Sequence, residues 1–199
     1  MAAINRADIQ ALAEAFDAAE HDARALVDGL TEQLGTWRAD PGSWSVAECL
    51  DHLGTGNCVY LRAMQPAAER AVRPRHRPAR PGLIGRCFVR MLEPPVNPRF
   101  KLKAPRAIRP RVSPPLGDAF AQFLTSQEEV RTFLRKYADI DLAGVRFPNP
   151  FVRGIRFSLA TGLHVLAAHE RRHLWQAWGV RQQAEQEAMR HRPFATGGQ

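Results

Sequence analysis

The 199-residue sequence has only three cysteines, and their positions exclude the usual cysteine-based sites. Cys49, Cys58 and Cys87 are odd in number, and no two of them are separated by only two residues. A disulfide framework pairs an even number of cysteines, and a cysteine zinc knuckle uses C-x-x-C pairs. The sequence therefore indicates neither, and we expect Cys49 and Cys58 to be small apolar residues of one helix.

Long apolar runs are also absent from the sequence. No segment approaches the roughly 20 apolar residues of a transmembrane helix, and charged residues interrupt the N-terminal stretch in which a signal peptide would place its apolar core. A cytoplasmic protein is the resulting expectation. Apolar residues still make up 45% of the chain, which is enough for a core. We predict a single domain over residues 1–199.

Acidic residues are nearly missing from one stretch of the chain. Between Arg73 and Arg111, twelve Lys or Arg residues accompany a single acid, Glu93. Such a segment could attract nucleic acid, an anionic membrane or an acidic ligand, or it could be a solvated connection. Because no nucleic-acid motif accompanies the charge, an adaptor for nucleic acid or membranes is the least favoured function.

Four segments have the apolar spacing of amphipathic helices, with apolar residues every three or four positions. They are residues 6–34, 46–72, 116–137 and 159–189. We expect Asn5 to cap the first helix and Gly35 to end it in a left-handed conformation. Ser45 and Glu48 form a capping box at the start of the second, and Ser158 is placed to cap the fourth. The pattern predicts an all-α fold, a four-helix bundle.

Prolines concentrate in residues 73–115, the connection between the second and third predicted helices. Proline removes a backbone donor and fixes φ, so long regular structure is not expected there. Residues 82–93 are the exception, because their apolar residues could form a short helix that anchors the connection to the bundle. We expect the basic residues around that helix to be solvated. A long crossover of this kind also permits helices two and three to be other than antiparallel neighbours.

Two histidines occupy the inward stripe of the last predicted helix. His169 and His173 are four residues apart, so both imidazoles lie on one helical face, where they could ligate one metal ion. His52 is on the second helix, on the same face as small residues such as Gly56, and facing helices of a bundle commonly share a metal. The alternative is three histidines that are satisfied separately. His164 lies on a different face, and we expect it to be structural or exposed.

Three polar residues near these histidines are candidates to support a metal or a substrate. Glu48 lies one turn before His52 and Asp51 is adjacent to it, so either could be an outer partner of the ligands or a proton acceptor. For Glu48 the capping role is the preferred interpretation. Gln176 lies one turn beyond His173 and could bond a metal-bound water or a ligand. Glu170, flanked by two arginines, is expected to be exposed.

The sequence resembles the DinB/YfiT-like superfamily of metal-dependent bundle proteins, which is unrelated to the DNA polymerase of similar name. The resemblance rests on Trp44-Ser45 before the helix that carries His52-Leu53, and on the string HERRHLWQ at residues 169–176. It implies a four-helix bundle with a long crossover after the second helix. It also implies a divalent ion, often zinc or nickel, held by the histidines matching His52, His169 and His173.

Several functions stay open at this point. The resemblance favours a metal-dependent enzyme that transfers a low-molecular-weight thiol or hydrolyses a small molecule, because three histidines leave the ion an open position. The alternative is a non-catalytic metal- or ligand-binding bundle protein. The oligomeric state is also open, with a homodimer among the alternatives.

Overall fold

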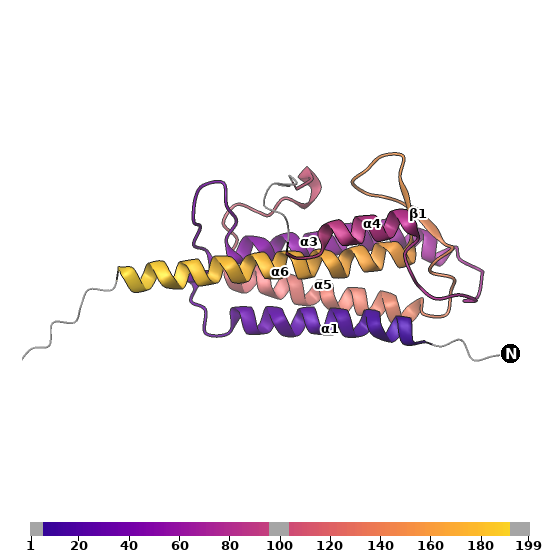
Figure 1. The fold of residues 1–199 in the computed structure, drawn as a ribbon, viewed down its shortest axis with the longest axis horizontal. Coiled ribbons are helices and arrows are strands. Elements are labelled where there is room, and N and C mark those ends of the chain that lie inside the picture. The colour runs from indigo at the N-terminus through magenta and orange to yellow at the C-terminus, as the bar shows by residue number, and fades with distance from the viewer. Residues whose placement is uncertain (1–5, 96–103, 192–199) are drawn as a thin grey trace, which may run out of the picture.

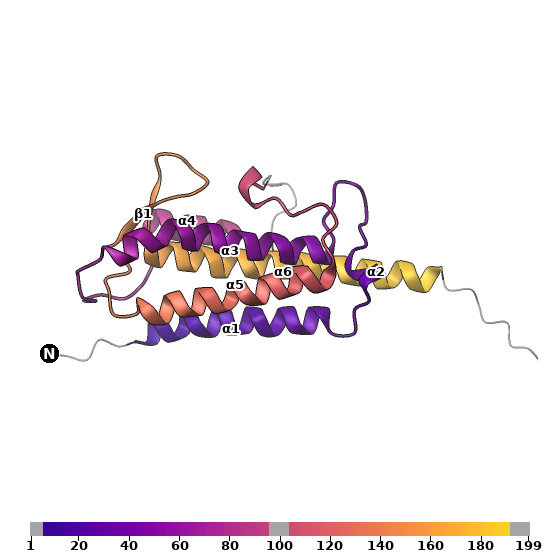
Figure 2. The same ribbon diagram turned by 180° about the vertical axis from the view of Figure 1, so that it is seen from behind.

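The structure is a computed structural model that describes residues 6–95 and 104–191. The described chain is mostly helical, as predicted, and four long helices lie side by side (Figures 1 and 2). Helix α3 packs against α5 and α6, and α1 packs against the same two helices from the other side. These helices are α1 (Ala7–Val27), α3 (Val46–Glu69), α5 (Leu116–Lys136) and α6 (Leu159–Arg190).

Two of the predicted helix starts are confirmed. Ser45 Oγ accepts the Glu48 amide at 3.2 Å, and Glu48 Oε2 accepts the Ser45 amide at 2.9 Å, which completes the capping box of α3. Ser158 Oγ accepts the Thr161 amide at 3.1 Å at the start of α6. These caps fix where both histidine-bearing helices begin, and therefore which residues of each face the other.

The end of the first helix was predicted wrongly. Helix α1 stops at Val27 and the chain turns at Gly29, whose φ of +67° is the left-handed conformation that we had assigned to Gly35. A separate short helix, α2 (Glu32–Gly35), follows. The apolar spacing runs on through this turn, which is why periodicity alone missed the break. Asn5, the predicted cap, lies outside the described residues.

The core depends on a close approach of α3 and α6. At Gly162 of α6, a Cβ atom would lie 2.6 Å from Met64 Sδ on α3 and 2.9 Å from the ring of Phe147. Met64 and Phe147 are themselves fully buried. The missing side chain at residue 162 therefore lets the two helices pack tightly about two turns before His169 and about three turns before His173.

Phe147 belongs to a small hairpin that the sequence did not predict. Strands β1 (Arg146–Pro148) and β2 (Arg156–Ser158) pair antiparallel in the segment between α5 and α6. Each strand has only three residues, too few to show the alternation that marks a strand. The hairpin inserts its central phenylalanines, Phe147 and Phe157, into the core.

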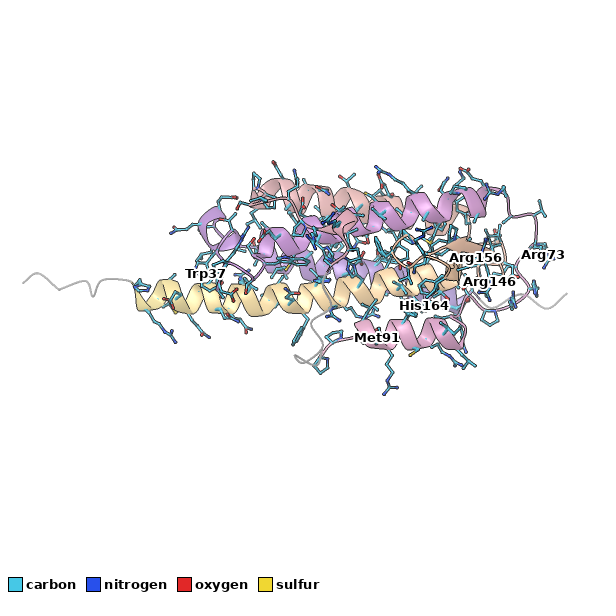
Figure 3. The ribbon with its side chains drawn as sticks, turned by 90° about the horizontal axis from the view of Figure 1, so that it is seen from above. Trp37, Arg73, Met91, Arg146, Arg156 and His164 are labelled. Atoms are coloured by element: carbon cyan, nitrogen blue, oxygen red, sulfur yellow. The ribbon has the colours of Figure 1, made fainter. Side chains whose placement is uncertain are left out.

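The Pro-rich connection contains the short helix that its apolar residues predict. Helix α4 (Leu83–Leu92) lies along α6, and His164 lies on the side of α6 that α4 covers (Figure 3). Phe88 of α4 contacts Phe157, with ring centroids 5.1 Å apart. The Nε2 atom of His164 is 3.1 Å from the Ala79 carbonyl oxygen, so this histidine has a structural contact, as expected.

The basic residues of the connection that the structure describes are exposed, as predicted, with the exception of Arg75, but three of them are also paired with acids. Arg75 is 6% exposed and binds Asp8 of α1, and Arg77 lies 3.0 Å from Asp141. Arg111 reaches Asp51 of α3 at 2.6 Å. The acids that neutralise them lie elsewhere in the chain, which a count confined to the connection could not show. None of the described helices is both long and apolar enough to cross a membrane.

Candidate metal centre

Helices α3 and α6 bring His52, His169 and His173 together. One ring nitrogen from each lies within 4.8 Å of the others, a group that could hold a metal ion. His52 Nε2 is 2.9 Å from His169 Nε2, and the three rings contact one another edge to face. The three residues singled out in the sequence therefore meet at one point, and His164 is separate from them. That they ligate a metal remains a prediction.

A glycine on α3 makes room for this arrangement. Gly56 lies one turn after His52 and faces His169, where a Cβ atom would lie 3.3 Å from His169 Cε1 and 3.7 Å from Nδ1. Any side chain at position 56 would press on the imidazole. Gly56, which the sequence analysis placed on the face of His52, thus mainly leaves space for His169 of α6.

Two of the histidines are oriented through their outer nitrogens. His52 Nδ1 contacts the Ile108 carbonyl oxygen, and His173 Nδ1 lies 3.1 Å from Gln176 Oε1. An N–H at Nδ1 that donates to an oxygen leaves the lone pair on Nε2, which is the atom available to an ion. Gln176, a sequence candidate, is therefore placed beside His173 as its outer partner.

The contact between His52 and the Ile108 carbonyl oxygen was not predicted from the sequence. Ile108 belongs to a 3-10 turn, η1 (Arg106–Ile108), in the Pro-rich connection. It acts through its backbone carbonyl, so no side-chain pattern could identify it. The one available signal is that Ile108 is an aliphatic residue among arginines and prolines, and it is indeed buried.

Burial keeps the three imidazoles neutral. It lowers the pKa of His52 below its ordinary value and that of His173 well below it. The pKa of His169 falls to about 3, first through burial and then because a second positive charge beside His52 or Arg172 is unfavourable. Trp44 covers one side, with its ring 4.7 Å from that of His52 and 5.6 Å from that of His173. Neutral, oriented imidazoles are the ligand form that zinc or nickel requires, so the residues present fit such an ion.

The two acidic candidates do not point to the cluster as free carboxylates. Glu48 is occupied by the capping box and by Arg38, 2.6 Å away. Asp51 is 1% exposed and accepts from the backbone amide and the side chain of Arg111, at 2.8 Å and 2.6 Å. Asp51 thereby ties α3 to the segment that carries Ile108. Its connection to His52 is indirect, through that segment.

Glu170 is fully buried, and its predicted exposure is wrong. Its Oε1 accepts from Asn57 Nδ2 of α3 at 2.8 Å, and Asn57 also donates to Ser126 of α5 at 3.0 Å. Burial raises the pKa of Glu170 to about 7, despite the hydrogen bonds that lower it. The prediction failed because it assumed that only one face of α6 is buried. The helix is covered on several sides, so position 170 also faces its neighbours.

A comparison with protein families identifies the family of the chain. The model of the DinB superfamily matches residues 15–177, which include all three histidines. The chain belongs to the DinB superfamily. The resemblance drawn from the tryptophan–serine start of α3 and from residues 169–176 is thus confirmed for this DinB protein. No curated protein and no solved structure matches the chain.

Proposed function

We propose that this DinB protein binds one divalent metal ion, zinc or nickel, through His52, His169 and His173, and uses it on a small-molecule substrate. The observation that carries the proposal is the convergence of three imidazoles, two of them in buried residues and one in a partly exposed residue, with one ring nitrogen from each within 4.8 Å of the others. Buried imidazoles without partners would carry a desolvation cost of about 1–3 kcal/mol each. A shared ion removes that cost, and a chance cluster does not.

The ion, when bound, supplies a Lewis acid with at least one position open to water, a thiol or a substrate. The protein's own part is to hold the rings. Ile108 and Gln176 fix the outer nitrogens of His52 and His173, Gly56 leaves room for His169, and Trp44 shields the cluster from water. Transfer of a low-molecular-weight thiol, or hydrolysis of a small molecule, is the enzymatic class that we propose.

A non-catalytic metal- or ligand-binding protein is the second candidate function. One observation favours it: in residues 6–95 and 104–191, the acids next to the histidines in sequence are already engaged. Glu48 and Asp51 are bound to arginines, and Glu170 is buried against Asn57. A hydrolase commonly needs a free base near its metal, whereas thiol transfer can proceed with a metal-activated thiolate alone. We further propose that residues 1–199 form one cytoplasmic four-helix-bundle domain, with residues 73–115 as its crossover.

Metal content measured on protein purified without a histidine tag tests the proposal. We expect one ion per chain, and most of it should be lost in His52→Ala, His169→Ala and His173→Ala. His164→Ala is the matched control, because that ring contacts a backbone carbonyl outside the cluster and should leave the metal content unchanged. Full metal retention in any of the first three variants would refute the ligand assignment.

A further inference from the structure

Three of the four acids around the histidine cluster are paired with arginines. The fourth, Glu170, lies on the face of α6 opposite Arg172, where the Asn57 amide donates to its Oε1 and its Oε2 has no partner among the described residues. Three neutral imidazoles add no negative charge, and an ion held by them keeps its full charge. The four pairs are Glu48–Arg38, Asp51–Arg111, Glu93–Arg171 and Glu170–Asn57.

Arg172 adds a further positive charge at this place. It lies on α6 between His169 and His173, is partly buried, and its Nη1 is 3.4 Å from the Met91 carbonyl oxygen at the end of α4. In the described parts of the chain, no carboxylate lies within ion-pairing distance of its guanidinium. Position 172 is three residues after His169 and one before His173, so its side chain borders the face of α6 that carries both imidazoles.

A guanidinium has five N–H donors in a planar fork, and a single long contact to a carbonyl uses few of them. The usual partner of such a fork is a carboxylate, which it binds through two parallel hydrogen bonds. Arg171, the neighbouring residue, has this partner in Glu93. Arg172 has the same side chain and lies next to His173, but no acid of the described residues pairs with it.

We propose that the site takes a small carboxylate-bearing ligand, with Arg172 binding the carboxylate and a second group of the ligand, such as a thiolate, facing the three histidines. This inference rests on the proposed function, because it assumes the metal ion. Its basis is the charge balance: a divalent ion and a partly buried arginine that pairs with no acid among the described residues favour a ligand that carries two negative charges. A thiol without a carboxylate would supply only one, as its thiolate.

Mercaptoacetate and mercaptoacetamide test the proposal, because they share the thiol and differ in the carboxylate. Both are titrated into cobalt-substituted protein, and binding is followed by the visible cobalt spectrum. We expect the wild-type protein to bind mercaptoacetate about tenfold more tightly than the amide, the effect of one charge-assisted contact. Arg172→Gln should remove this preference while leaving the affinity for the amide and the cobalt content unchanged.

Arg86→Gln is the matched control. It removes the same charge from an exposed position on α4, next to Gly85, which approaches Thr161 of α6. Thr161 lies about 16 Å along α6 from Arg172, at 1.5 Å per residue. We expect this variant to keep the wild-type preference. If it loses the preference as Arg172→Gln does, the effect is one of overall charge and the assignment to Arg172 is refuted.

The remaining outcomes separate this inference from the proposed function. If the wild-type protein does not bind cobalt, the proposed function fails. If cobalt binds but mercaptoacetate has no advantage, or if Arg172→Gln keeps the advantage, the metal centre stands and the carboxylate site is refuted. Should Arg172→Gln lose its helical circular dichroism, Arg172→Lys decides the question. Lysine keeps the charge without the fork, so we expect part of the preference to remain, and an undiminished preference would refute the bidentate contact.

Discussion

Gly56→Ala should separate the stability of the fold from the affinity of the metal centre. In the middle of α3, alanine is favoured over glycine by about 1 kcal/mol, because glycine loses more backbone freedom on folding. The added Cβ would lie 3.3 Å from His169 Cε1, which is closer than an ordinary van der Waals contact. The imidazole must therefore move by a few tenths of an ångström, and in the metal-free protein a flexible ring can do so at little cost.

The same displacement is costly once an ion is bound. His169 Nε2 has to meet the same point as the nitrogens of His52 and His173, and these two rings are held by Ile108 and Gln176. Changes to the residues around metal ligands typically weaken metal affinity by about 10- to 100-fold. We expect the loss of metal affinity in Gly56→Ala to be at the lower end of that range. The free energy of unfolding of the metal-free protein should be unchanged or higher by up to about 1 kcal/mol.

Two measurements check this pair of effects. Urea unfolding in the presence of a chelator gives the stability of the metal-free fold, and competition with a chromophoric chelator gives the metal affinity. Gly179→Ala on α6 is the matched control, because a Cβ there would meet nothing within 4 Å. It should raise stability by about 1 kcal/mol and leave metal affinity unchanged. If Gly56→Ala binds metal as tightly as the wild-type protein, the close contact with His169 does not position that ligand.

Three further predictions concern the fold. Gly162→Ala should destabilise the protein by about 1–3 kcal/mol in urea unfolding, because its Cβ would lie 2.6 Å from Met64 Sδ in a filled core. Burial alone would raise the pKa of Asp8, but the Ala79 amide and Arg75 lower it overall. This carboxylate therefore stabilises the fold above about pH 4, and the contribution is lost as the pH falls through the folded-state pKa; Asp8→Asn should flatten that acid limb. Chelation should leave the helical circular dichroism intact, because helices of this length bury enough apolar surface to fold without metal. Collapse of the helical signal would indicate a structural ion instead.

The histidine site could be predicted to the extent that it follows helical geometry. The spacing of His169 and His173 fixes a shared face, and the capping box at Ser45 fixes where the helix of His52 begins. Helix α4 was predictable for the same reason, since its apolar spacing is a local property. Each of these inferences needs only residues that are close in sequence.

The features that the sequence could not give depend on contacts between distant segments. The arginines that follow Glu170 in the sequence suggest an exposed residue, yet Glu170 is buried and accepts from Asn57 of α3, which also donates to Ser126 of α5. The turn at Gly29 is invisible to periodicity, because apolar residues continue at the same spacing on both sides of it. Burial on a second face of a helix, and a break inside a periodic pattern, both require knowledge of what packs there.

The Pro-rich basic connection, residues 73–115, also makes contacts with distant segments that bear on the histidine site. Its charge suggested a separate binding surface, but Arg75, Arg77 and Arg111 use their charge on acids of the helical body and of the loop after α5. The Arg111–Asp51 pair holds the end of the connection against α3, next to His52. Because the same segment supplies the Ile108 carbonyl to the His52 ring, the order of the segment and the orientation of that ring are coupled. The end of the connection that carries Ile108 and Arg111 therefore forms one wall of the histidine site.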